Sequence, residues 1–182
     1  MSAQVQIVGE TAPRYATPTD YYRIFVEEMD SLYLLAFLLT ADKDMAEQSV
    51  VGGLGECLER IGVFMERARS WARRAIVKDA IRKIRPAPQE GANEFFGSAK
   101  TQESVGASNP FAFITSLRSF ERFVFVMSVL EAQPDEDCQS LLGCSRQEVV
   151  MARKAAMKLF GAATRRFEFD HEGLFVWPRI LN

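Results

Sequence analysis

The sequence predicts an all-α protein built as two small helical domains joined by a flexible linker. Two observations favour this fold class. Apolar residues recur at helical spacing on both sides of the middle of the chain, and a polar stretch rich in proline, glycine and serine lies between the two halves. No segment carries a convincing strand pattern. The predicted arm, first domain, linker, second domain and tail are, in order, 1–16, 17–85, 86–110, 111–161 and 162–182.

The first helix is expected to begin at Thr17, because a hydroxyl side chain there precedes Pro18 and Asp20. It should end near Thr40. The residues that repeat at helical spacing along it form one apolar stripe: Tyr22, Phe25, Val26, Met29, Leu32, Leu35, Ala36 and Leu39.

Two further helices complete the first domain. One begins between Asp42 and Asp44 and is interrupted by glycines, each of which costs about 1 kcal/mol relative to alanine. Its predicted buried face consists of Ala46, Val50, Leu54, Cys57, Leu58 and Ile61. The other helix runs from about Phe64 to Ile84, and its apolar residues are Trp71, Ala75, Ile76, Ala80, Ile81 and Ile84.

The segment 111–131 is predicted to be one helix whose aromatic residues fall on nearly every side. These residues are Phe111, Phe113, Phe120, Phe123 and Phe125, and the apolar Val126 adds to them. A domain of about fifty residues cannot cover them all by itself. We therefore expect this helix to pack on a further surface, either the first domain or the C-terminal tail.

A short helix, a turn and a capped helix follow. The short helix covers about 133–142, and Gly143 fits its left-handed terminus. Ser145 and Glu148 form a capping box that opens a helix expected to continue to about residue 160. This is the outline of a helix-turn-helix, whose second helix enters the DNA major groove. Helix hairpins with a glycine turn also occur in plain bundles, so the spacing alone leaves both interpretations open.

Composition limits the classes of function. Of the 182 residues, 48% are hydrophobic and 25% charged, and the net charge of −2 excludes a uniformly basic surface. The single histidine, His171, cannot assemble a zinc site, and no catalytic set or phosphate loop is present. We therefore expect no enzymatic activity and no bound metal or cofactor. The three cysteines lie in apolar segments and are expected to be reduced thiols: Cys57, Cys138 and Cys144.

Membrane and export signals are not evident in the sequence. No apolar run is long enough to span a bilayer, and the N-terminus lacks a basic stretch followed by an apolar one. The sequence predicts a cytoplasmic protein without membrane insertion.

Charge is distributed unevenly within the first domain. Residues 20–59 carry nine acids and two bases, whereas residues 60–85 carry nine bases and two acids. The basic helix is either a solvated face neutralised by the acidic helices beside it, or a surface that contacts nucleic-acid phosphates. The sequence leaves both interpretations open.

Several segments resemble the bacterial sigma factors of the extracytoplasmic-function group, the two-domain members of the sigma-70 family. Residues 31–47 look like the start of sigma region 2, and Ser-Trp-Ala-Arg-Arg at 70–74 looks like its promoter-melting helix. Residues 117–160 resemble sigma region 4 without a gap. The matching residues there include Val124-Phe125-Val126, Val129-Leu130-Glu131, Glu136, Leu141-Leu142-Gly143-Cys144-Ser145, Val149, Ala156 and Lys158. The order of the domains and the linker length also agree.

The resemblance implies a DNA-binding subunit that directs transcription initiation, with core RNA polymerase and promoter DNA as partners and an anti-sigma factor as a further candidate. It implies binding without catalysis. The region 4-like contacts to the −35 element would come from Ser145, Arg146, Gln147, Arg153 and Lys154. The region 2-like contacts to the −10 element would come from Arg69, Arg73, Arg74, Lys78, Arg82 and Lys83. Polymerase contacts would come from Glu47, Gln48 and Val51, and Trp71 would lie mainly in the core.

Some positions depart from the family pattern. Gln48, Val51 and Gly52 stand where the family has an acid and a Gln-Glu pair that help to hold the polymerase. On the reading helix, Val150-Met151-Ala152 replaces a basic-Ser-Arg run. The alternative interpretation is therefore a divergent sigma-like regulatory protein that has lost promoter function and acts through protein–protein contacts.

Overall fold

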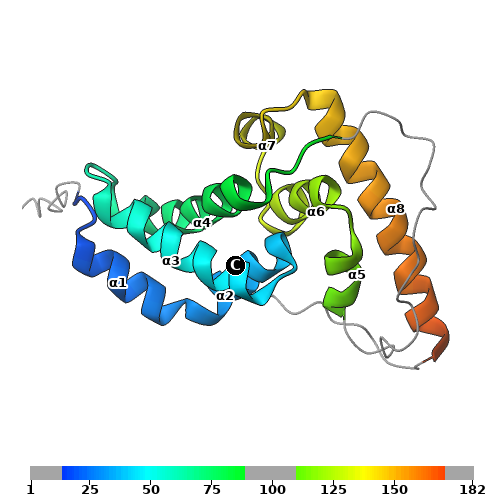
Figure 1. The fold of residues 1–182 in the computed structure, drawn as a ribbon, viewed down its shortest axis with the longest axis horizontal. Coiled ribbons are helices and arrows are strands. Elements are labelled where there is room, and N and C mark those ends of the chain that lie inside the picture. The colour runs from blue at the N-terminus through cyan, green and yellow to red at the C-terminus, as the bar shows by residue number, and fades with distance from the viewer. Residues whose placement is uncertain (1–13, 89–109, 171–182) are drawn as a thin grey trace, which may run out of the picture.

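The computed structural model describes residues 14–88 and 110–170, which form an all-α fold (Figure 1). The elements are α1 (Pro18–Glu27), α2 (Met29–Thr40), α3 (Lys43–Glu59), the 3-10 turn η1 (Met65–Arg67), α4 (Ala68–Ile84), α5 (Pro110–Ser116), α6 (Ser119–Phe125), the π-helical turn η2 (Val126–Leu130), α7 (Asp135–Leu142) and α8 (Arg146–Asp170). Within these two ranges no strand forms, and the β-pairing is an isolated bridge between Tyr15 and Phe64. The predicted all-α class is confirmed.

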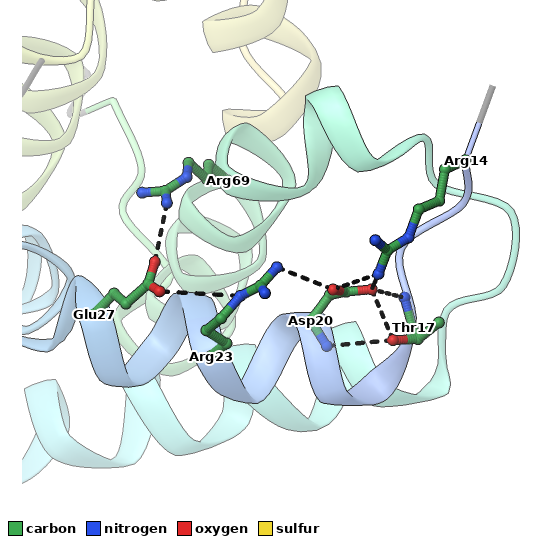
Figure 2. Close-up of polar contacts among 6 residues, drawn as sticks. All are labelled: Arg14, Thr17, Asp20, Arg23, Glu27 and Arg69. Atoms are coloured by element: carbon green, nitrogen blue, oxygen red, sulfur yellow. Dashed lines mark hydrogen bonds and ion pairs between the residues drawn. The ribbon is translucent and has the colours of Figure 1, made fainter. Parts of the chain in front are cut away.

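Helix α1 begins at the predicted cap, which is part of a larger polar network (Figure 2). The Asp20 carboxylate accepts hydrogen bonds from the Thr17 backbone and hydroxyl at 3.0 and 2.7 Å, from Arg14 at 2.9 Å and from Arg23 at 3.1 Å. Its side chain is almost fully buried. The hydrogen bonds from Thr17, followed by Arg14, lower the pKa of Asp20 to about 2. The network fixes the chain entering α1.

The first predicted helix is in fact two helices, because Glu28 has a non-helical backbone (φ −110°, ψ 16°) that separates α1 from α2. The predicted stripe is correspondingly wrong at three positions. Tyr22, Val26 and Met29 are exposed at 53, 76 and 44%. The buried residues of α1 are instead Asp20, Tyr21, Ile24 and Phe25.

The glycines of α3 do not interrupt it, contrary to prediction. A Cβ built on Gly52 would lie 2.5 Å from an oxygen of Asp79, and one on Gly53 would lie 3.0 Å from the backbone nitrogen of Ile76. These two glycines therefore let α3 approach α4 closely. The predicted burial of Ile61 is also wrong: it follows the end of α3 and is 94% exposed.

The predicted single helix 111–131 is divided into α5, α6 and η2. The break falls at Leu117 and Arg118, where Arg118 is extended (φ −59°, ψ 151°). The buried guanidinium of Arg122 stabilises this break, since its Nη1 donates to the carbonyls of Thr115 and Leu117 at 3.4 and 3.1 Å. The same group reaches the end of α2, where Nε donates to Leu39.

The aromatic segment packs on the first half of the chain, which confirms the first of its two predicted surfaces. One hydrophobic cluster contains Phe120, Phe123 and Val124 of α6 together with residues of α2 and α4. The residues that α2 and α4 contribute are Leu35, Leu38, Leu39, Val77 and Ala80. A second cluster is made mainly by α1 to α4. Residues 171–182 of the predicted tail and 89–109 of the predicted linker lie outside the described residues, so the tail contact and the division into separable domains stay predictions.

The predicted turn and cap before the last helix are confirmed. Gly143 has φ +64°, and the Glu148 carboxylate accepts hydrogen bonds from the Ser145 backbone and hydroxyl, both at 2.7 Å. Helix α8 extends to Asp170 instead of ending near Phe160, so the first part of the predicted tail is helical. All three cysteines are free thiols, as expected.

Candidate nucleic-acid interface

Helices α7 and α8 form a hairpin in which the two axes cross steeply: Figure 1 shows α7 nearly end-on and α8 running across the view. An ion pair holds them together, since Arg153 donates to the two carboxylate oxygens of Asp135 at 2.6 and 3.3 Å. This pairing lowers the pKa of Asp135. Val149, Ala152 and Ala156 form the buried side of α8. The hairpin thus has the form of a helix-turn-helix.

The outward side of α8 carries a line of four exposed side chains, which we call the α8 face. They are Gln147, Met151, Lys154 and Lys158, spaced so that each lies about one turn from the next. Neither lysine has a carboxylate partner among the side chains that the structure describes. The α8 face is therefore accessible and positively charged.

The five predicted region 4-like residues divide into two groups. Arg146, Gln147 and Lys154 project from the hairpin, with the Arg146 side chain 70% exposed and its Nε 3.8 Å from Asp135. Ser145 and Arg153 have structural partners instead, Glu148 for the first and Asp135 for the second. The structure does not place all five on one surface.

Each of the six bases predicted to face DNA from α4 lies within ion-pair distance of a carboxylate. Within the first half of the chain the pairs are Arg69 with Glu27 and Glu28, Lys78 with Glu56, Arg82 with Glu56 and Asp79, and Lys83 with Asp79. The pair between Arg69 and Glu27 is drawn in Figure 2. Neighbouring acidic side chains thus neutralise the basic helix. This agrees with the first of the two interpretations of its charge, a face neutralised by the acidic helices beside it.

The remaining two bases of α4 join the two halves of the chain. Arg73 makes a bidentate pair with Glu131, with Nε 2.6 Å and Nη2 2.5 Å from the carboxylate oxygens. Both side chains are largely buried, at 15% and 5% exposure. Arg74 pairs with Asp137 at 3.0 Å. Glu131, just after η2, and Asp137, in the first turn of α7, therefore occupy guanidinium groups that a phosphate would otherwise contact.

A cleft of about 520 Å³ lies beside these pairs. It is lined by Arg67, Ser70, Trp71, Arg73, Arg74, Glu131, Ala132, Gln133, Pro134 and Asp137. Trp71 is only partly buried and packs against the cluster of α1 to α4, so its predicted core position holds in part. The cations of Arg60 and Lys78 lie over its ring, 4.6 and 4.9 Å from the centroid. Trp71 thus contacts two cations as well as the apolar cluster.

The predicted polymerase-binding residues are all exposed on α3. Glu47 and Gln48 lie on consecutive positions, and Val51 is 70% exposed. The backbone carbonyl of Gln48 accepts a hydrogen bond from Lys83 at 3.4 Å. A single exposed valine does not by itself mark an interface, so the binding of polymerase there stays a prediction.

Sequence reasoning missed Arg122, which is 8% exposed and, among the described residues, donates only to backbone carbonyls. It has no carboxylate partner among the described residues. Arg122 stands among mainly apolar residues in the segment 120–127. Because a base in such a segment is buried only when its donors are satisfied, the sequence could have predicted an arginine with polar partners here.

Comparison of the sequence with protein-family models and with curated proteins finds no match. The resemblance to sigma factors therefore stays a prediction based on the motifs. Across residues 14–88 and 110–170, none of the helices combines the length and apolar character that crossing a membrane requires.

Proposed function

We propose that this protein is a DNA-binding regulator of transcription of the sigma-factor type, which contacts duplex DNA through the α8 face and binds core RNA polymerase through α3. The observation that carries the proposal is the α8 face itself. It lies on the second helix of a hairpin with helix-turn-helix form, and its two lysines are without carboxylate partners among the described side chains.

The contrast between α4 and α8 supports a division of roles. Every base of α4 predicted to face DNA is paired with an acid, so contact of α4 with phosphates requires those acids to give way. The lysines of the α8 face need no such rearrangement, and their phosphate contacts would release counterions directly. Initial duplex binding is therefore assigned to α8. The contacts of Arg73 and Arg74 of α4 are assigned to a state in which polymerase has separated the two halves.

Salt-dependent binding by the full chain tests the role of α8. Fluorescence anisotropy with a duplex selected from a random library should show affinity that falls with KCl. Lys154→Ala and Lys158→Ala should each reduce the slope of log K against log salt by about 0.9, the value for one phosphate contact. Lys43→Ala is the matched control, because Lys43 is an exposed lysine at the start of α3. Equal slopes for all three variants would contradict the proposal that the lysines of α8 contact DNA phosphates.

Capture on purified bacterial core RNA polymerase tests the role of α3. Val51→Arg should abolish capture, because it replaces the apolar member of the proposed contact with a long cationic side chain. Val26→Arg is the matched control, since Val26 is 76% exposed on α1. Equal capture of the two variants would exclude α3 as the polymerase surface.

The neutralised α4 favours a second candidate, a sigma-like regulator that acts only through protein–protein contacts. All six bases are engaged by acidic groups, so the α4 surface that the resemblance assigns to promoter melting is not available to DNA in this structure. Capture by polymerase together with duplex affinity that does not depend on sequence or on Lys154 would favour this candidate over the first.

A further inference from the structure

We infer that Gln147 and Met151 read base edges in the major groove, Gln147 at an adenine and Met151 at the methyl group of a thymine. The inference rests on the proposed function, because it concerns the same α8 face. Both side chains are exposed and lie four residues apart, one turn along the helix, so they can meet neighbouring base pairs.

The Gln147 amide is free to make base contacts. No hydrogen bond to another described residue engages this side chain, and it belongs to the first turn of α8, the part of a reading helix that approaches base edges. A carboxamide presents a donor and an acceptor side by side. This arrangement matches the N6 donor and N7 acceptor of adenine.

Met151 is an apolar side chain in a polar, cationic setting. It is 57% exposed, with Gln147 one turn before it and Lys154 and Lys158 after it on the same face. Both lysines lie on the C-terminal side of Met151 and would hold backbone phosphates there, so Met151 lies between these phosphate contacts and the base contact of Gln147. The C5-methyl of thymine is the apolar group that B-DNA displays there, and a flexible thioether can adapt to it.

The alternative occupant, a protein partner, is less well matched to this face. A protein interface buries an extended apolar patch, whereas the other three members of the α8 face are polar. The other exposed apolar residues of α8, Met157 and Leu159, come after Lys154 and do not belong to the face. Charge complementarity of the unpaired lysines therefore favours duplex DNA.

The test uses the full chain and a duplex that the chain itself selects from a random library. Each thymine is replaced in turn by deoxyuridine, which removes only the methyl group, and affinity is measured by anisotropy at constant salt. We expect one position, or two adjacent ones, to lose about fourfold in affinity, the effect of losing one buried methyl-sized group. Met151→Ala should abolish that loss. Met157→Ala, which changes an exposed methionine outside the face, should retain it.

Gln147→Ala should remove the preference for A·T over G·C at a neighbouring pair.

The outcomes separate this inference from the proposed function. Selective duplex binding that tolerates deoxyuridine at every position, or a methyl effect that survives in Met151→Ala, overturns the reading inference and leaves α8 as a DNA-binding helix. Failure of the wild-type chain to select any duplex overturns the proposed function and the inference together.

Discussion

The Nε of Arg122 donates a hydrogen bond of 2.9 Å to the carbonyl oxygen of Leu39, a residue 83 positions earlier in the chain. Nη2 of the same guanidinium donates to Thr40 at 3.3 Å, and Nη1 donates to carbonyls at the end of α5. One buried cation thus satisfies the last carbonyls of two helices from different halves of the chain, where the helix dipoles favour positive charge.

Replacing this cation should destabilise the whole fold. Arg122→Leu leaves buried carbonyls without donors, and we expect it to lower the free energy of unfolding by about 2–4 kcal/mol. Urea denaturation followed by circular dichroism measures this loss. Arg85→Leu serves as the control, because Arg85 is an exposed arginine just after α4, and its stability should stay close to that of the wild type. Equal stabilities of the two variants would contradict the capping role of Arg122.

The pairs Arg73–Glu131 and Arg74–Asp137 should restrain α4 from binding DNA. Glu131→Gln combined with Asp137→Asn releases two guanidinium groups, so the slope of log K against log salt should steepen by up to about 2. Loss of the buried Glu131 charge should also lower the free energy of unfolding by about 1–3 kcal/mol.

Glu136→Gln provides the control for this prediction, because Glu136 is exposed in the same turn of α7 and its substitution changes the net charge in the same direction. A salt dependence that steepens equally in Glu136→Gln would show a general charge effect. An unchanged slope in the double variant would exclude Arg73 and Arg74 from DNA contact.

The glycines of α3 should differ in their tolerance of a side chain. Gly53→Ala brings a Cβ to 3.0 Å from the backbone nitrogen of Ile76, so α3 and α4 must separate, and we expect a loss of about 1–3 kcal/mol. A Cβ added at Gly55 would meet open space, so Gly55→Ala should stabilise the helix by about 0.5–1 kcal/mol. Thermal unfolding of the two variants should therefore shift in opposite directions. A stabilised Gly53→Ala protein would argue against the close approach of the two helices.

The network around Asp20 should make stability depend on pH in the acid range. The folded pKa of Asp20 is about 2 and its ordinary value is 3.8, so its contribution is complete above about pH 4 and is lost as pH falls towards 2. Denaturation midpoints measured between pH 2 and 5 should decline less for Asp20→Asn than for the wild type. Asp30→Asn, at an exposed position of α2, should follow the wild-type profile. Identical profiles for Asp20→Asn and the wild type would show that the network does not depend on the carboxylate.

The sequence by itself determined the fold class and the local signals at the helix ends. The caps at Thr17 and Ser145 and the left-handed Gly143 all appear where they are predicted. Each of these features depends on hydrogen bonds between residues only a few positions apart, so a short pattern contains the information they need. The exposed positions of Gln147 and Lys154 follow similarly from the helical period of α8.

Tertiary structure decided which surfaces remain accessible. The break at Leu117 depends on Arg122, whose other partners lie in α2, and the state of Arg73 depends on Glu131, 58 positions away. The basic stretch of α4 is the same in sequence whether its charges are solvated, paired with acids or bound to phosphates. Packing of the two halves brings acidic groups to Arg73 and Arg74, whereas no described carboxylate pairs with Lys154. Pairing between charges that are distant in the sequence has no local pattern, so only the tertiary structure shows which bases are neutralised.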